Sequence, residues 1–172
     1  NGQVDLGKFS LDNIEEISLY SGQKSEIFQS AKEFGSDGSI YLTTRRPRFH
    51  EEKNTNLRVS LKAGSSDLIK PSILYEYKID ERISTSFNAE WTNPSGKYKF
   101  RYRRVTPSGE LAYDTTAVRQ NGDIDAVRVE AGLHGVLPNG LLKMTFYHYN
   151  SERGVPGAIV HNVWKRGERL WD

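Results

Sequence analysis

The sequence contains no cysteine, which excludes disulfide bridges, thiol chemistry and cysteine-ligated metal sites. No apolar run approaches the roughly 20 residues that a transmembrane helix needs, so we expect no helix that spans a membrane. Neither sign of charge predominates, because 24 Lys and Arg residues face 22 Asp and Glu residues and leave a formal net charge of +2. Without a long basic cluster, nucleic acid is not expected as the main partner.

Motifs of known catalytic and cofactor sites are also missing. The chain has no P-loop, no dinucleotide-binding fingerprint and no nucleophile elbow. Its four histidines do not share the spacing of metal ligands; they are His50, His134, His148 and His161. We therefore expect neither an enzyme nor a resident cofactor or metal. Asp123 and Asp125 form one acidic pair suited to calcium, although a solvated loop edge is the commoner role of such a pair.

What the sequence does contain is alternation of apolar and polar residues, which predicts a mainly β chain of antiparallel strands. The alternation recurs over residues 57–63, 73–79, 84–91, 127–134 and 142–150, and a sixth strand begins within 168–172. These strands reach about ten residues, twice the ordinary length and enough to cross a bilayer with tilt.

The predicted connections alternate in length. Residues 80–82 and 137–140 are short turns, whereas residues 93–122 and 152–167 are long. The turn at 64–67 is the exception, because it is short where this scheme would permit a long loop. Membrane β-barrels have short turns on one rim and long loops on the other, and the low mean hydropathy fits such a barrel because its strands alternate lipid-facing with lumen-facing residues. Tyr75, Tyr77 and Trp91 are expected on the apolar side, where an aromatic girdle would lie.

A different unit precedes these strands. Residues 14–20 and 39–44 are predicted strands, residues 25–32 a short helix and residues 35–38 a turn. Residues 45–47, two arginines and a proline, end the second strand, and a polar linker follows at 50–55. Asn1 is not preceded by a signal peptide, and the first residues already have the pattern of packing inside a domain, so we expect an internal piece of a longer protein.

The N-terminal unit and the strands after it carry the motifs of one family. The motifs of the unit are Ile14-Glu15, Gly22, Ser30-Ala31, Gly35, Gly38 and residues 40–47, IYLTTRRP. Together they resemble the closing part of the plug domain of TonB-dependent outer-membrane receptors. Residues 56–64, 72–91 and 147–162 resemble early barrel strands of Bacteroidetes-type receptors, including those related to cobalamin receptors. Ser21 departs from the pattern, since the family usually has an arginine before the glycine, and residues 31–34 are less glycine-rich than in the family.

This resemblance implies a fold with two parts. Residues 1–49 would be the C-terminal part of the plug domain, and residues 50–172 the N-terminal strands of an antiparallel up-and-down transmembrane β-barrel of about 22 strands, present here as a partial barrel. In the family, plug arginines contact glutamates of the barrel wall. Arg45, Arg46 and Glu90 are accordingly the candidates for plug–barrel contact.

The resemblance also implies a function in the bacterial outer membrane: import of a scarce solute, such as cobalamin or an iron–siderophore chelate. The implied partners are a TonB-type energy-transducing complex, a small-molecule or chelate ligand, membrane lipid and a surface lipoprotein. No covalent chemistry is involved. The alternative hypothesis is a soluble β-sandwich that serves as a carbohydrate-binding module of a secreted or surface protein, with exposed tyrosines and tryptophans as its binding groups.

Residues 93–122 are the strongest candidate for ligand binding, because aromatic and cationic side chains alternate there. Such a surface can hold a planar, anionic or metal-chelated ligand by stacking and by ion pairing. The candidate ligand-binding residues are Tyr98, Tyr102, Arg104, Tyr113, Arg153 and Trp164, the last two flanking a loop motif of the family at residues 154–157. A simpler interpretation of the first half of the segment is a continued strand or the start of a partner strand.

Overall fold

The computed structural model describes residues 6–21, 38–50, 52–157 and 167–172, and in these ranges the chain is mainly antiparallel β structure, as predicted. Two 3-10 turns, η1 (Leu6–Lys8) and η2 (Leu11–Asn13), precede the first strand. Within those ranges no helix is both long enough and apolar enough to traverse a membrane. The helix predicted at 25–32, most of the turn predicted at 35–38, and Trp164 lie outside the described residues.

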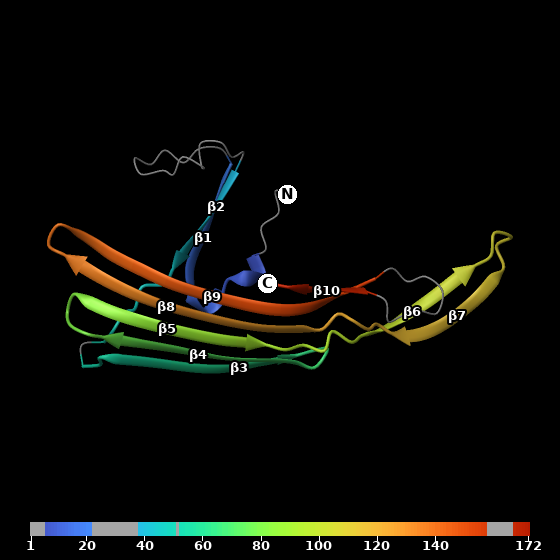
Figure 1. Cartoon of the computed structure of the whole chain (residues 1–172), viewed down its shortest axis with the longest axis horizontal. Coiled ribbons are helices and arrows are strands. Elements are labelled where there is room, and N and C mark those ends of the chain that lie inside the picture. Colours follow the sequence, from blue (N-terminus) through green and yellow to red (C-terminus); the bar gives the residue numbers. More distant parts are fainter. Residues whose placement is uncertain (1–5, 22–37, 51, 158–166) are drawn as a thin grey trace.

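The largest sheet has six strands in the order β10-β9-β8-β5-β4-β3, all antiparallel (Figure 1). Its strands are β3 (Thr55–Gly64), β4 (Leu68–Lys78), β5 (Ile83–Thr92), β8 (Ile124–Leu137), β9 (Gly140–Pro156) and β10 (Gly167–Trp171). Each of the strands predicted within residues 57–172 is present. β9 is longer than predicted, because its pairing with β8 continues to Arg153 and its pairing with β10 continues to Pro156. The long connection expected at 152–167 therefore begins as strand.

Cross-strand register sorts the side chains of this sheet into alternating rows. One row joins Leu57, Tyr75, Phe87, Ala131 and Phe146, which are successive register partners on five strands. The adjacent row, displaced by one residue, joins Leu74, Asn88, Glu130 and Tyr147. Because successive side chains of a strand point to opposite faces, the first row lies on an apolar face and the second on a polar one.

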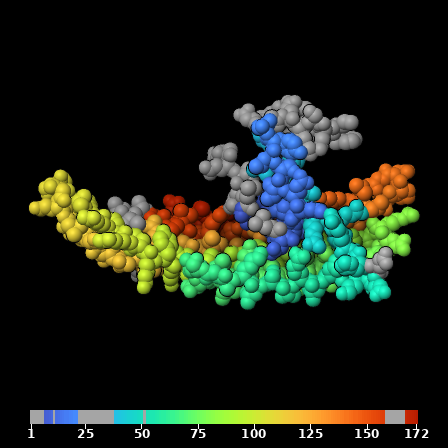
Figure 2. Space-filling model, turned by 180° about the vertical axis from the view of Figure 1, so that it is seen from behind, coloured from blue at the N-terminus to red at the C-terminus, as the bar shows by residue number. Residues whose placement is uncertain are grey.

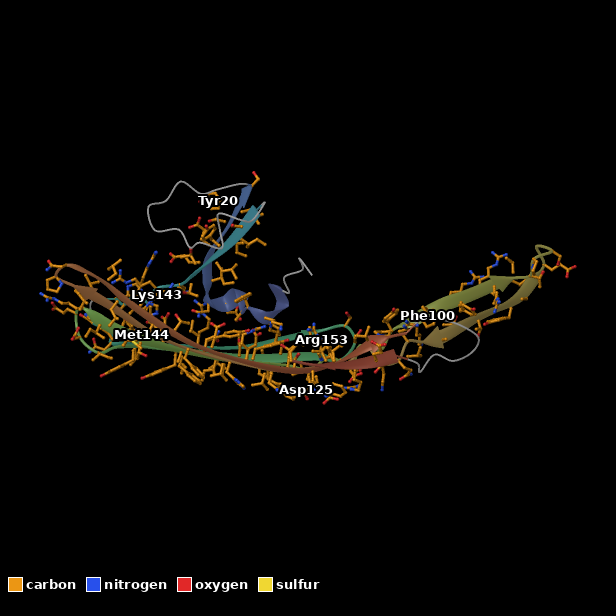
Figure 3. The ribbon with its side chains drawn as sticks, turned by 45° about the horizontal axis from the view of Figure 1, so that its top comes forward. Tyr20, Phe100, Asp125, Lys143, Met144 and Arg153 are labelled. Atoms are coloured by element: carbon orange, nitrogen blue, oxygen red, sulfur yellow. The ribbon has the colours of Figure 1, made fainter. Side chains whose placement is uncertain are left out.

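A hairpin of β1 (Ile14–Ser21) and β2 (Gly38–Thr44) stands on one side of the six-stranded sheet (Figures 1 and 2). We call the face of the sheet on this side the inner face and the opposite one the outer face. Figure 3 shows the alternation on two strands: Lys143 and Arg153 point to the inner side, whereas Met144 and Asp125 point to the outer side.

The segment expected as a long loop at 93–122 is instead a second hairpin, of β6 (Lys99–Val105) and β7 (Leu111–Val118), which extends beyond the end of the sheet (Figure 1). The loop prediction was wrong, and the simpler interpretation as strand was the better one. Alternating aromatic and basic residues suit an extended strand, and a turn over residues 106–110 closes the hairpin, with Gly109 at φ +86°.

The base of this β6–β7 hairpin is closely packed. Gly96 has φ +62°, and a side chain there would overlap the backbone of Gly122. Asn121, also at positive φ, donates from Nδ2 to the carbonyl oxygens of Val155 on β9 and Glu168 on β10, each at 3.1 Å. These contacts tie the hairpin base to the six-stranded sheet.

Candidate functional site

The inner face contains a buried ionic cluster centred on Glu90 of β5. Its carboxylate pairs with Arg128, its register partner on β8, and with Lys70 Nζ of β4 at 3.0 Å. Ser10 Oγ, from the segment before β1, donates to Glu90 Oε2 at 3.3 Å. Glu90 is 5% exposed and Arg128 6%, so this ion pair lies away from solvent and requires the additional hydrogen bonds that it receives.

The same face binds the backbone of the N-terminal segment. Arg128 donates from Nε to the carbonyl oxygen of Lys8 at 2.5 Å and from a second nitrogen to that of Gly7. The Tyr147 hydroxyl also donates to the Lys8 carbonyl, and the Tyr147 ring stacks on Phe9 with centroids 6.0 Å apart. The segment is therefore held by side chains of two neighbouring strands, β8 and β9.

Two further glutamates of the inner face accept hydrogen bonds. Asn13 Nδ2 donates to Glu130 Oε2 on β8 at 2.6 Å. Asn56 Nδ2 donates to Glu76 Oε2 on β4 at 2.9 Å, and Arg45 Nε lies 4.0 Å from the other carboxylate oxygen of Glu76. Like Glu90, both glutamates are buried, so each carboxylate depends on these donors in place of water.

The three candidates for plug–barrel contact therefore occupy different places. Arg45 lies beside the sheet glutamate Glu76, at the outer limit of an ion pair. Glu90 contacts the N-terminal unit through Ser10, whereas its arginine partner, Arg128, belongs to the sheet itself. Arg46 lines two cavities, one beside the end of β2 and one beside the turn between β4 and β5, and it forms no ion pair with any described residue.

The candidate ligand-binding residues of the β6–β7 hairpin form an exposed cluster beyond the sheet. The Tyr102 and Tyr113 rings lie across the two strands with centroids 4.9 Å apart, and Arg104 is the register partner of Tyr113. The ring of Tyr98, just before β6, is tilted against the ring of Phe100 within β6, with centroids 6.3 Å apart. The neighbouring Tyr102 hydroxyl raises the pKa of Tyr113.

One basic residue of the hairpin is already neutralised. Arg101 donates from Nε to Asp114 Oδ1 at 2.7 Å and from a second nitrogen to the other carboxylate oxygen. This hydrogen bond holds the pKa of Asp114 below its ordinary value and raises that of Arg101. The remaining basic side chains, Arg103 and Arg104 among them, leave an exposed surface with excess positive charge beside the aromatic rings.

The other candidates do not join this cluster. Arg153 lies on β9, where its guanidinium pairs with Asp172 at 2.6 Å. Asp123 accepts from Arg169 at 2.9 Å, and Asp125 accepts from Trp91 Nε1 at 2.9 Å and from Asn93 at 3.1 Å. Both aspartates proposed for calcium thus bind side chains of the chain itself. The described part of the chain contains no group of three or more His, Asp or Glu residues arranged to hold a metal ion.

The sequence reasoning missed Arg128, Glu130, Ser10 and Asn13, which join the N-terminal segment to the sheet. It also missed Lys70, which pairs with Glu90 within the sheet. One signal was available: Arg128, Glu130 and His134 alternate with the apolar residues of β8 and so share one face. No signal was available for their partners, because the contacts join residues 80 to 139 positions apart.

No protein-family model matches the chain, and no curated protein does.

Proposed function

We propose that this chain is part of a TonB-dependent receptor of the bacterial outer membrane, which imports a scarce solute such as cobalamin or an iron chelate. Residues 1–49 are the end of its plug domain and residues 50–172 its first barrel strands. One observation carries the proposal: in the six-stranded sheet the covered face is polar and the uncovered face is apolar.

The covered, inner face is polar almost throughout. Among the described residues, only Leu74 and Ala126 are buried hydrophobic side chains. The buried polar side chains of the sheet are Glu76, Ser86, Asn88, Glu90, Arg128, Glu130, His134 and Ser151. A water-soluble sheet buries its apolar face and leaves the polar face to solvent, so this distribution is the reverse of the usual one.

The outer face is apolar and exposed across five strands. Its exposed large side chains include Leu57, Val59, Leu61, Ile73, Tyr75, Tyr77, Phe87, Trp91, Val127, Met144 and Phe146. Covering a side chain of this size contributes about 1.5–3 kcal/mol, and a continuous patch of this extent is expected only where another apolar phase covers it. Lipid is the phase that meets the outside of a membrane barrel, whose interior is polar.

The height of the apolar band fits a bilayer. On β8 the outward residues from 127 to 135 span about 27 Å at about 3.4 Å per residue. With a strand tilt of ~40°, this length corresponds to about 21 Å along the membrane normal, close to the ~25 Å band of outer-membrane barrels. Asn93, Asp123, Asp125 and Arg169 lie beyond Val127 and bound the band with polar groups.

The N-terminal unit meets the inner face through hydrogen bonds and ion pairs, which suits a plug that must be displaced during transport. Contacts such as Ser10 to Glu90 and Asn13 to Glu130 can exchange their partners for water when the unit moves. A large apolar interface would oppose that movement, because exposing its apolar area to water costs free energy in proportion to the area. Work enters by a conformational change of the plug, driven by the TonB-type complex.

The β6–β7 hairpin supports ligand capture on the long-connection rim, opposite the short turns at 79–82 and 138–139. Tyr102, Tyr113 and Arg104 present aromatic and cationic groups to a solute approaching from outside. A surface lipoprotein that covers this rim is a further proposed partner.

The experiment that tests the proposal is the electrophoretic migration of the full-length protein, from membrane fractions, with and without boiling. A receptor barrel will be extracted only with detergent, and the unheated sample will run faster than the boiled one. Recovery without detergent and equal mobility would contradict the proposal. That result would favour the carbohydrate-binding β-sandwich, in which a second sheet covers the face of Tyr75, Tyr77 and Trp91.

A further inference from the structure

A row that contains three basic side chains and one serine crosses four strands of the inner face near the short-turn rim. Lys78 of β4, Ser84 of β5, His134 of β8 and Lys143 of β9 are successive register partners. His134 and Lys143 are therefore directly opposite one another. Basic groups placed opposite each other across strands repel when both are charged, so the row is unfavourable unless something offsets its charge.

No carboxylate of the described residues lies in this row, but Asp80 and Glu81 line a cavity at its Lys78 end. Glu76 accepts from Asn56 at 2.9 Å and lies near Arg45. Glu15 pairs with Arg48 at 2.6 Å. Asp80 accepts the backbone N–H groups of the turn that follows it, each at 2.7 Å. Asp80 and Glu81 offset the charge at the Lys78 end of the row, whereas Glu15, the carboxylate that lines the cavity beside His134 and Lys143, is already paired with Arg48.

Arg46 adds a further cation above the row and lies between two cavities. One cavity, of about 210 Å³, is lined by Arg46 with Lys78 and Arg82 and also by the carboxylates of Asp80 and Glu81. The other, of about 180 Å³, is lined by Arg46 with His134, Lys143 and the already paired Glu15. Arg46 lies two positions after the end of β2, so the N-terminal unit brings this guanidinium to the sheet.

We propose that Arg46, His134 and Lys143, which line one cavity together, form a binding site for a small phosphate-class oxyanion. The planar fork of Arg46 matches two oxygens of a tetrahedral anion, and the Lys143 ammonium group supplies charge from the side. The cavity, of about 180 Å³, is smaller than the roughly 300 Å³ at which drug-sized ligands are accommodated, which fits a small anion. The site depends only on the row and on Arg46, so the proposal does not rest on solute import.

The test is isothermal titration of the full-length protein with inorganic phosphate, at low ionic strength and in the form in which the protein is recovered. Arg46→Gln and Lys143→Gln are each expected to weaken phosphate binding by about 10-fold to 100-fold, because each removes one charge-assisted hydrogen bond. Arg46→Lys keeps the charge but loses the fork, and it is expected to retain part of the affinity.

Arg103→Gln is the matched control, since it removes one positive charge from the distal β6–β7 hairpin. Phosphate binding that Arg103→Gln leaves unchanged and that Arg46→Gln weakens would support the site. No binding by the unaltered protein, or equal weakening by Arg103→Gln, would overturn it. If Arg46→Gln does not fold, Lys143→Gln on β9 serves as the test instead. An unchanged phosphate affinity in that variant would also overturn the proposal.

Discussion

Arg128 of β8 and Glu90 of β5 are register partners that form an ion pair with both side chains almost completely buried. The same guanidinium donates to the carbonyl oxygens of Gly7 and Lys8. One arginine thus joins two strands of the sheet to a segment that precedes them by more than 80 residues. The interior of this part of the molecule is organised by charge and hydrogen bonding, with little apolar packing.

Arg128→Ala is expected to release the N-terminal segment from the sheet. Removing one partner of a buried pair costs about 3–5 kcal/mol, and we expect the lower end because Lys70 still contacts Glu90 at 3.0 Å. A loss of about 3 kcal/mol corresponds to a roughly 100-fold change in the equilibrium between bound and released segment. Hydrogen exchange at residues 7–13 of the full-length protein, followed by mass spectrometry, measures this change.

The matched control for that experiment is Arg48→Ala. Arg48 pairs with Glu15 at 2.6 Å, but the Arg48 side chain is 79% exposed. Exposed pairs of this kind contribute about 0–1 kcal/mol, so exchange at residues 7–13 should hardly change. Equal acceleration by Arg48→Ala and Arg128→Ala would contradict the special role of the buried pair.

Phe146→Lys is expected to impair folding into lipid. Phe146 is 62% exposed on the outer face and lies in the central row of the apolar band. A lysine at the mid-plane of a membrane barrel costs about 2–4 kcal/mol, falling to about 0–1 kcal/mol near the interface. Ala63→Lys, at the exposed end of β3, is the matched control. The folded fraction in lipid vesicles is measured by heat-dependent mobility, and equal folded fractions would contradict a lipid-facing surface.

Gly96→Ala is expected to loosen the base of the β6–β7 hairpin. A residue with a side chain at φ +62° costs about 1–2 kcal/mol, and the added methyl group would also overlap Gly122. Limited proteolysis of the hairpin should therefore become faster. Gly140→Ala serves as control because no atom lies within 4 Å of its added methyl group. In this variant the hairpin should be cleaved at the same rate as in the unaltered protein. Unchanged proteolysis of Gly96→Ala would show that the base is not closely packed.

The Arg101–Asp114 pair predicts how the hairpin responds to acid. The folded pKa of Asp114 lies below its ordinary value of 3.8 because Arg101 donates to the carboxylate. The pair therefore contributes its full stabilisation above pH 3.8 and loses it as the pH falls through the lower, folded pKa. A fluorine label on Tyr113, followed by NMR, reports this transition. Asp114→Asn should abolish the transition, and a persistent transition in that variant would assign it to another group.

The strands of the six-stranded sheet could be predicted from sequence because each has one apolar face. In β8, for example, Val127 and Val129 alternate with Arg128 and Glu130, and period two is visible without any tertiary information. The β6–β7 hairpin was missed because neither of its faces is apolar. Phe100, Tyr102 and Arg104 share one face and basic residues line the other. Such a composition is as typical of a loop as of a strand.

The contacts of the N-terminal segment could not be predicted, because local pattern carries no information on pairs so distant in sequence. The family resemblance suggested Arg45, Arg46 and Glu90, and two of these have partners across the interface: Arg45 lies near Glu76, and Glu90 accepts from Ser10. The remaining position, Arg46, lies between cavities. Contacts to backbone carbonyls, such as that of Arg128 to Lys8, leave no signature in the residue that accepts them.

The closely packed base of the β6–β7 hairpin has a consequence for how this protein can diversify. Close backbone contacts are concentrated at Gly96, Asn121 and Gly122, whereas a side chain added at Gly109, in the turn at the far end, would have no atom within 4 Å. Sequence length and composition can therefore drift at the tip without disturbing strand pairing in the six-stranded sheet. The hairpin is a place where new specificities can evolve, and where a tag or epitope can be inserted.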